Sequence, residues 1–376
     1  MPSRKANNTI LMQSPHDVCA IHSMEKDNNP MNKENVIGID ALYESLEKCS
    51  KGVRWKGTVA YYRHNWTDEI EKLSNELHNG TYKERKPKYF TVTEPKYREI
   101  MSIHFRDRIY QRSLNDVAIY PQASVSYIAD NFACQKGKGT KAARDRLSEF
   151  LHRYYRKYGA EGYILKIDIK GYYPNMSHAY VSDMFNDYMD EETYQMAMGV
   201  LDRIPGEVGY NPGSQIVQIV GITALDKLDH YIKERLRIKF YIRYMDDFII
   251  LHHDKNYLQN CLNKIKTILA KQDMEVSEKK TFIQKISDPV KFLGFVYRLT
   301  PSGKVVILAD PAKIKHEKLK INRMLALVEK GKLTLYEVDR HFKAYKAGIR
   351  YGNCGKLLCK LNLWYGELRK GYVKNG

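Results

Sequence analysis

Residues 238–254 read IKFYIRYMDDFIILHHD, a run of apolar and aromatic residues that two adjacent aspartates interrupt. Strand-forming residues extend to Met245 and resume at Phe248, so the pattern predicts a buried β-hairpin with Asp246 and Asp247 at a tight reversal. Two carboxylates this close repel each other, and each loses hydration when it is buried. The stretch therefore indicates a site for a cation.

A third acid, Asp168, lies in a second strand-forming segment, YILKIDIKGYYPN (163–175). By itself it is equally compatible with a solvated edge residue or a turn cap. If the two segments are neighbouring strands, Asp168 and Asp246 come close enough to share two Mg²⁺ ions, which prefer carboxylate and phosphate oxygens. Two such ions can activate a 3′-hydroxyl and stabilise a leaving pyrophosphate.

The composition of the whole chain favours a globular protein with a polyanionic partner. Its 376 residues carry a formal net charge of +18, and 43% of them are hydrophobic. The length predicts two or three structural units. The positive charge favours nucleic acid, because a basic surface attracts phosphates and releases counterions on binding. A charge that serves only solubility is the alternative.

Other bulk features predict a cytoplasmic protein without a membrane partner. No stretch of eighteen apolar residues occurs, and the N-terminal residues lack the apolar centre of a signal peptide. The six cysteines have no C-x-x-C spacing, which argues against a disulfide framework and a zinc site.

The periodicity changes along the chain. Residues 1–37 are polar and lack a period, so an extension is expected there. Strands and helices then alternate, with hairpins predicted over 88–104 and 291–308 and one long helix over 213–236. After about residue 310 only basic helical patterns follow, and the fold class predicted is α+β with an α-helical C-terminal unit.

Five segments resemble motifs of bacterial reverse transcriptases and occur in the order of that family. They are EPKYREIMSIHFRDRIYQ (94–111), YILKIDIKGYYPNM (163–176), YIRYMDDFII (241–250), MEVSEKKTFIQ (274–284) and KFLGFVYRL (291–299). The resemblance covers roughly residues 55–300 and implies a right-hand polymerase with an antiparallel palm sheet. The domains implied are an N-terminal extension (1–37), fingers with N-terminal helices (38–160), a palm with interleaved fingers elements (161–308) and an α-helical thumb (309–376).

The same resemblance implies an RNA-directed DNA polymerase that extends a 3′-hydroxyl with dNTPs on an RNA template. Two Mg²⁺ ions are the expected cofactors, with Mn²⁺ as a substitute. The partners implied are template RNA, a DNA primer and product, a dedicated non-coding RNA and an accessory protein. The setting would be a diversity-generating retroelement, an antiphage defence system or a group II intron-like orphan. An untemplated or protein-primed DNA polymerase and an inactive RNA-binding scaffold are the alternatives.

The resemblance also assigns roles near the acids. Asp168, Asp246 and Asp247 would be catalytic and would bind metal, together with the backbone carbonyl of Ile169. Tyr173 falls where the family places an aromatic ring under the incoming sugar, although core packing is the alternative and Tyr172 is its rival. The other nucleotide-binding candidates are Lys96 and Arg98 for the triphosphate and Lys280, which touches substrate or only stabilises the palm.

The segment GYNPGSQIVQIVG (209–221) departs from the pattern of many relatives. Pro212 and Gly213 replace a Gln-Gly pair, and Val217 and Gln218 replace a Ser-Pro pair. Gln218 resembles the residue of diversity-generating retroelements, which copy adenines with low fidelity. Gly213 and Gln218 would then lie against the templating base pair; alternatively, Gln218 caps a buried backbone group.

The remaining candidates are expected to contact nucleic acid through charge or stacking, although each could instead be a solvated or core residue. They are Arg106, Arg108, Lys136, Lys138, Tyr244, Met245, Lys313, Lys315 and Lys318. Phe342, Trp364 and Tyr365 are expected in the core of the thumb rather than on its surface.

Overall fold

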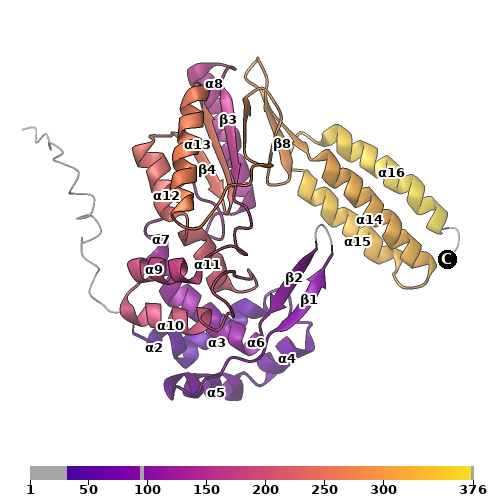
Figure 1. Cartoon of the computed structure of the whole chain (residues 1–376). Helices are drawn as coiled ribbons and strands as arrows, with labels where there is room; N and C mark the ends of the chain where they lie inside the picture. Colours follow the sequence, from indigo (N-terminus) through magenta and orange to yellow (C-terminus); the bar gives the residue numbers. More distant parts are fainter. Residues whose placement is uncertain (1–31, 94–96, 374–376) are drawn as a thin grey trace, which may run out of the picture.

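The computed structural model of the chain describes residues 32–93 and 97–373. They form a helical part with a projecting hairpin, a central sheet covered by helices, and a three-helix bundle (Figure 1). This mixture of helices and antiparallel sheets confirms the predicted α+β class. No helix in the described ranges has the length and apolar character needed to cross a membrane.

The helical part lies below the sheet in Figure 1. Its elements are α2 (Glu34–Ile37), α3 (Ile39–Ser50), α4 (Gly57–His64), α5 (Trp66–His78), α6 (Phe105–Leu114), the π-helical segment η2 (Asn115–Ile119) and α7 (Tyr120–Ser124). Val36 and Ile37 are buried in the same cluster as α3 and α6. The predicted extension is therefore too long by at least these residues, because two apolar side chains suffice to anchor a single helical turn.

The first predicted hairpin is confirmed as β1 (Lys88–Val92) and β2 (Arg98–Ser102), which pair antiparallel. It projects from the helical part toward the bundle (Figure 1). Tyr89 and Phe90 are 56% and 51% exposed, so the described residues leave both faces of β1 open to solvent.

The central sheet has the strand order β4-β5-β3-β6, and all of its pairings are antiparallel. Its strands are β3 (Tyr163–Asp168), β4 (Phe240–Tyr244), β5 (Asp247–His252) and β6 (Phe282–Lys285). Alternate residues face opposite sides, so Ile164 packs with α8 (Thr140–Tyr158) whereas Leu165 packs with α13 (Lys255–Ala270). A helix on each face buries this sheet.

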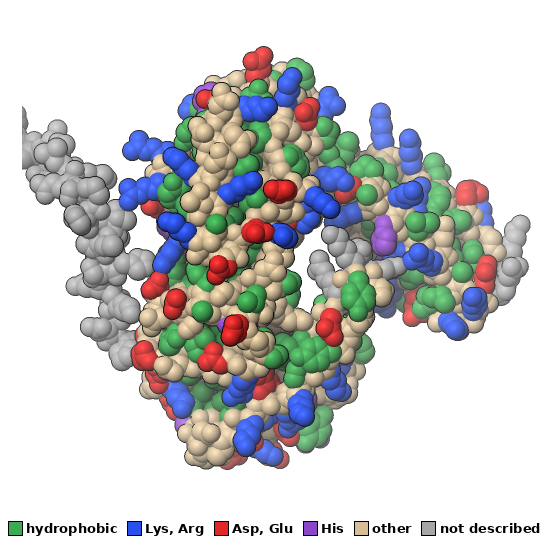
Figure 2. Space-filling view, in the orientation of Figure 1, with side chains coloured by type: hydrophobic (Ala, Val, Ile, Leu, Met, Phe, Trp, Pro, Cys, Tyr) green, Lys and Arg blue, Asp and Glu red, His purple; other side chains and the backbone are tan. Residues whose placement is uncertain are grey.

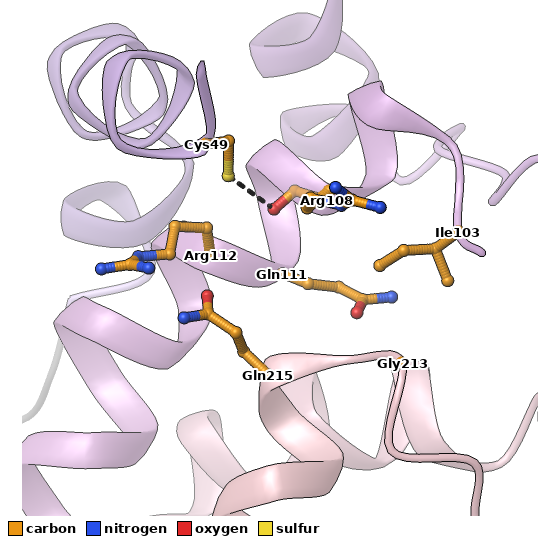
Figure 3. A pocket seen from close by; sticks show the side chains of 7 residues that line it. All are labelled: Cys49, Ile103, Arg108, Gln111, Arg112, Gly213 and Gln215. Atoms are coloured by element: carbon orange, nitrogen blue, oxygen red, sulfur yellow. Dashed lines mark hydrogen bonds between the residues drawn. The ribbon is translucent and has the colours of Figure 1, made fainter. Parts of the chain in front are cut away.

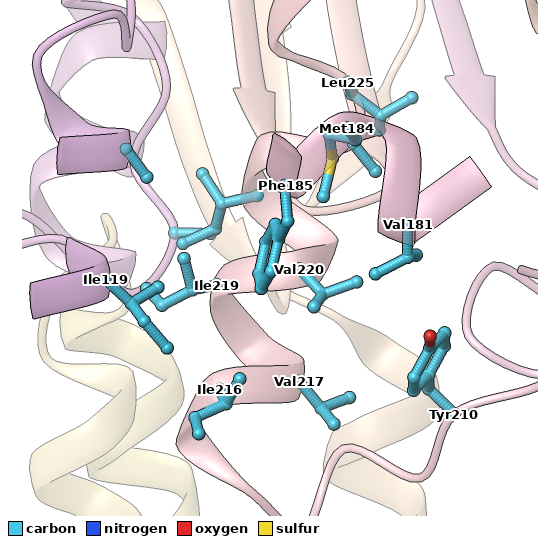
Figure 4. Packing of buried hydrophobic residues seen from close by; sticks show 14 of the residues in the cluster. Ile119, Val181, Met184, Phe185, Tyr210, Ile216, Val217, Ile219, Val220 and Leu225 are labelled. Carbon is cyan, nitrogen blue, oxygen red and sulfur yellow. The ribbon is translucent and has the colours of Figure 1, made fainter. Parts of the chain in front are cut away.

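Four helical segments lie between β3 and β4: α9 (His178–Tyr188), α10 (Glu191–Leu201), α11 (Gln215–Thr223) and α12 (Asp226–His230), which continues as the π-helical segment η3 (Tyr231–Arg235). The single long helix predicted over 213–236 is wrong, because the chain breaks between Thr223 and Asp226. The apolar spacing continues across the break, so periodicity could not reveal it. Helix α11 places Ile216, Val217 and Val220 in the core (Figure 4).

A second sheet lies between the central sheet and the bundle. Its strands are β7 (Val290–Phe292), β8 (Phe295–Leu299) and β9 (Val305–Ala309) in that order, and the β8–β9 turn at residues 301–303 is the one predicted. The bundle follows directly and consists of α14 (Pro311–Glu329), α15 (Leu335–Ile349) and α16 (Gly355–Val373). Phe342 and Tyr365 stack in its separate core, as expected, and Trp364 packs against it.

Candidate active site

The ends of two neighbouring strands bring the three acids together. Strand β3 ends at Asp168 and β5 begins at Asp247, and these two residues are partners in the antiparallel register. Tyr244 pairs with Asp247 across the hairpin, so Met245 and Asp246 form a two-residue turn. The predicted hairpin and the predicted neighbouring strand are therefore both present.

The turn is held in an uncommon backbone conformation. Met245 has a φ of 54°, in the left-handed region that residues other than glycine rarely adopt. Burial raises the pKa of the Asp246 carboxyl above its usual value, and the nearby charge of Asp168 raises it further, whereas a hydrogen bond to the backbone opposes the shift. The charge of Asp168 therefore acts on the Asp246 carboxyl.

A lysine accompanies each of the two paired acids. The ammonium of Lys280 lies 2.7 Å from Oδ1 of Asp168, and the Lys280 side chain is 54% exposed. The ammonium of Lys166 lies 3.0 Å from Oδ1 of Asp247, and the Lys166 side chain is only 12% exposed. Burial raises the pKa of Asp247 to about 6, against the opposing effect of Lys166. The exposed Lys280 side chain has room to move away from Asp168, whereas the Lys166 side chain is largely shielded from solvent.

The donor set fits a divalent metal that also binds substrate. Among residues 32–93 and 97–373, no group of three or more Asp, Glu, His or Cys side chains is placed to hold a metal. Mg²⁺ needs fewer, because substrate phosphates and water supply its other ligands. Asp168 already holds a cation, the Lys280 ammonium. The chain on either side of Ile169 is held by backbone hydrogen bonds: the amide of Ser277 donates to the carbonyl of Asp168, and the amide of Lys170 donates to the carbonyl of Glu275. Neither bond uses the carbonyl of Ile169.

The two adjacent tyrosines occupy different environments. Tyr172 is 4% exposed, and its hydroxyl donates to the carbonyl of Gly221. Tyr173 is half-buried, and its hydroxyl lies 3.7 Å from Sδ of Met245 in the Met245–Asp246 turn. Gly221 leaves room for this ring, because a Cβ there would lie 2.5 Å from the Tyr173 hydroxyl. Of the two rings, Tyr173 is therefore the one whose hydroxyl contacts the Met245–Asp246 turn.

Gln218 projects from α11 and is half-exposed. Its Oε1 accepts a hydrogen bond from Sγ of Cys134 at 3.5 Å, so this oxygen binds a side chain rather than the buried backbone group considered as its alternative partner. Cys134 has a φ of 47°, a second left-handed residue near the turn. Val217, which stands where relatives have serine, is 1% exposed and belongs to the core.

Gly213 begins the turn into α11 and lies against β2. A Cβ at this position would stand 2.2 Å from the carbonyl oxygen of Met101, so only glycine fits. Gly213 and Arg108 line a pocket of about 280 Å³ between α6 and α11 (Figure 3). The half-buried Arg108 stands beside Gln111 there.

Two of the cations predicted to contact nucleic acid have partners within the protein. Arg106 is 5% exposed, forms an ion pair with Glu76 and stacks on Tyr82. Lys138 donates to the carbonyls of Ile128, Ala129 and Asn131, so its ammonium fastens its own loop. Both cations are thus engaged by other groups of the protein, Arg106 by a residue of α5 and Lys138 within its own loop.

The other predicted contacts stay available or lie outside what the structure describes. Lys136 is exposed, and Tyr244 and Met245 are half-buried beside the acids. Lys96 lies outside the described residues, and Arg98 is placed in β2 by its backbone alone.

The thumb lysines do not share one face of α14. At about 100° per residue, Lys313 and Lys315 lie about 200° apart around the helix. Lys313 reaches the β7–β8 turn, since a Cβ on Gly294 would stand 2.7 Å from its ammonium. Lys318 lies over the ring of Trp364 at 4.8 Å.

Sequence reasoning missed a fully buried ion pair beneath the turn. Arg243 and Asp229 are both 0% exposed and contact each other at 2.6 Å. Arg243 also donates to the carbonyls of Met245 and Ile222, and Tyr241 donates to Asp229. An arginine inside an apolar strand was the available signal, because such a charge needs a buried partner.

Comparisons with known proteins support this geometry at the level of family. Residues 85–297 match the family described as reverse transcriptase (RNA-dependent DNA polymerase). No curated protein matches.

Among solved structures, a Candida albicans telomerase in complex with a fragment of telomeric RNA matches at 13% identity and a TM-score of 0.47, over 61% of this chain and 46% of that one. An apo telomerase from Candida tropicalis matches at 13% identity and a TM-score of 0.43, over 64% of this chain and 53% of that one. The chain thus spans about half the length of these proteins. The likeness is weak, and the assignment rests on the sequence match.

Proposed function

The chain belongs to the reverse transcriptase family of RNA-dependent DNA polymerases, and from this premise we propose that it extends a DNA 3′-hydroxyl with dNTPs on an RNA template. The observation that carries the proposal is the pairing of Asp168 with Asp247 beside the two-residue turn that holds Asp246. Acids fixed at strand ends present their oxygens with little rearrangement, as in-line phosphoryl transfer requires.

We propose that Asp168 and Asp246, with the Ile169 carbonyl, hold two Mg²⁺ ions. When bound, these ions lower the pKa of the 3′-hydroxyl and stabilise charge on the leaving pyrophosphate. Lys280 leaves Asp168 and turns toward the triphosphate, which its exposure permits. Asp247 keeps Lys166 as its partner and supports the turn from below.

The remaining pocket residues orient the nucleotide in this proposal. Tyr173 lies under the sugar and disfavours a ribose 2′-hydroxyl, and Gln218 faces the base pair from α11. By the family resemblance, Lys96 and Arg98 are assigned to the triphosphate, and Lys136 in the loop before α8 to the template. On the first thumb helix, the flank of α14 that carries Lys313 contacts the duplex.

Primer extension on an RNA template with a DNA primer and Mg²⁺ tests this function. The wild-type protein should extend the primer, and Asp246→Asn should lose about 10³-fold in rate, because a carboxylate proposed to hold Mg²⁺ is replaced by a neutral amide. The Asp246→Asn protein should still bind primer–template. A wild-type protein that binds but never extends would support the scaffold alternative. Product made without template, or attached to protein, would support the untemplated or protein-primed alternative.

We further propose that the polymerase belongs to a bacterial retroelement or antiphage defence system. Gln218 supports the former, because diversity-generating retroelements carry glutamine at this position. Sequencing of products should reveal frequent misincorporation opposite template adenines, and Gln218→Pro should reduce it. An error rate that is equal at all four template bases in both proteins would contradict the proposal.

A further inference from the structure

The ammonium of Lys166 lies between the catalytic hairpin and the second sheet. It is 3.0 Å from Oδ1 of Asp247, and it donates a hydrogen bond of 2.6 Å to the carbonyl of Lys291 in β7. It also donates to Oδ2 of Asp247 at 3.2 Å. One buried cation thus joins a carboxylate of the site to the backbone of another sheet.

The register of the central sheet explains how Lys166 reaches both partners. Residues two apart on a strand face the same side, so Lys166 shares a face with Asp168. Lys166 pairs with Ile249, and Asp168 pairs with Asp247. Asp247 is therefore the diagonal neighbour of Lys166 on the adjacent strand, within reach of a long side chain.

A second cation also reaches the turn between β7 and β8, but without touching an acid. Arg144 of α8 donates to the carbonyl of Leu293 from Nε at 3.1 Å and from Nη2 at 2.6 Å. Its guanidinium stacks on Phe295 at 4.6 Å. Among the described residues, Lys166 is the only cation in contact with Asp247, so it forms the polar link between the second sheet and this acid, beside the apolar packing of the two sheets.

We propose that Lys166 is a positioning residue that keeps the catalytic hairpin in register with the sheet that carries the thumb. Strand β9 of that sheet leads directly into α14 of the thumb. The position of β7 therefore affects the position of a duplex bound by the thumb. A shift of β7 against Asp247 would move a bound primer end relative to the acids. The identity of the bound duplex rests on the proposed function, whereas the mechanical link does not.

The link itself can be tested without catalysis by a double-mutant cycle read in thermal unfolding. Lys166→Met and Asp247→Asn should be strongly non-additive, because each removes the same contact. Arg144→Gln and Asp247→Asn should be additive, since Arg144 does not touch the acid. Additivity of the Lys166 pair, or equal coupling of the Arg144 pair, would overturn the inference.

The consequence for the primer is tested with 2-aminopurine at the primer 3′ end. Lys166→Met should bind primer–template with unchanged affinity but give a different 2-aminopurine fluorescence, because the terminal base is seated differently. Its extension rate at saturating dNTP should fall, by up to about 100-fold for a misplacement near 1 Å, and Lys166→Arg should restore part of it. If Lys166→Met has the same 2-aminopurine fluorescence and the same extension rate as the wild-type protein, the inference is wrong. A wild-type enzyme that fails to extend refutes the proposed function and leaves the unfolding cycle valid.

Discussion

At the scale of single residues, neighbours in the sequence acquire different roles through their depth in the fold. Tyr172 and Tyr173 are chemically identical, yet the hydroxyl of Tyr172 binds a helix carbonyl in the core and that of Tyr173 lies beside the catalytic turn. Gly221 faces both rings from α11. The two positions therefore offer a matched pair of variants.

Replacement of Tyr173 should relax sugar selection. Tyr173→Ala removes the ring proposed to meet a ribose 2′-hydroxyl, and the preference for dNTP over rNTP should fall by about 10- to 100-fold, as for other steric contacts. The ratio of kcat/KM values for dGTP and GTP measures it. Tyr172→Phe should lower the melting temperature, by loss of one buried hydrogen bond, with the ratio unchanged. A fall of the ratio in Tyr172→Ala that is absent in Tyr173→Ala would assign the gate to Tyr172.

Individual residues also show where prediction from sequence ends. The acids were predictable because adjacency and strand pattern are local properties. Arg106 and Lys138 look like free cations in the sequence, but Glu76 and the carbonyls of residues 128–131 occupy them. Only the tertiary fold brings those partners near.

At the scale of elements, the buried pair of Arg243 and Asp229 joins segments that the sequence keeps apart. Arg243 of β4 binds Asp229 of α12 and the carbonyl of Ile222 in α11. Its own backbone pairs with residues 130 and 132 before α8. The break between α11 and α12, which periodicity did not reveal, is what turns Asp229 toward this arginine.

Removal of Arg243 should destabilise the fold strongly. Arg243→Met leaves Asp229 buried without a counter-charge, which costs about 3–5 kcal/mol for pairs of this kind. Urea unfolding measures the free energy of unfolding. Adding Asp229→Leu to Arg243→Met should recover much of the loss, since no charge is then buried. A double variant less stable than Arg243→Met would show that Asp229 is satisfied by other groups, such as the Tyr241 hydroxyl.

The contact of α12 and η3 with the loop at Ser126 should depend on pH. Burial lowers the pKa of His230, but the contact with Glu234 at 2.6 Å and the carbonyl of Ser126 more than offset this, so the pKa is raised. Because the folded state favours the protonated ring, the stabilisation is complete below the unfolded pKa of about 6.5 and is lost as pH rises through the folded value.

His230→Gln measures that dependence. The variant should lose more unfolding free energy relative to wild type at about pH 5.5 than at about pH 8.5, on the two sides of the usual pKa. Urea titrations at both values give the difference. A larger loss at the higher pH would mean that the neutral ring is the stabilising form.

At the scale of the whole molecule, the net charge of +18 predicted a polyanionic partner but not its location. Figure 2 shows Lys and Arg side chains at the rim of the opening between the body and the thumb. Lys313 and Lys315 were both expected to contact nucleic acid. In α14, however, Lys313 points toward the β7–β8 turn, and Lys315 lies on another side of the helix. Charge counts cannot resolve such directions.

The two sides of α14 should differ in their effect on binding. Lys313→Ala should reduce the slope of log K against log salt concentration by about 0.9, as expected when one phosphate contact is lost. Lys315→Ala should leave the slope unchanged. Fluorescence anisotropy of a labelled primer–template across a salt series measures both. The opposite result would place the duplex on the other flank of the helix.

The thumb is fastened to its sheet more than once. The chain enters it at Asp310, and the loop between α15 and α16 returns to bind β9: Asn353 exchanges two hydrogen bonds with Ile307, and Cys354 accepts one from Ala309. A domain attached at one point can rotate about any axis through that point, whereas a domain attached along a line can rotate only about that line. We therefore expect the thumb to swing about an axis along β9 rather than to twist or slide, which would limit it to one opening coordinate.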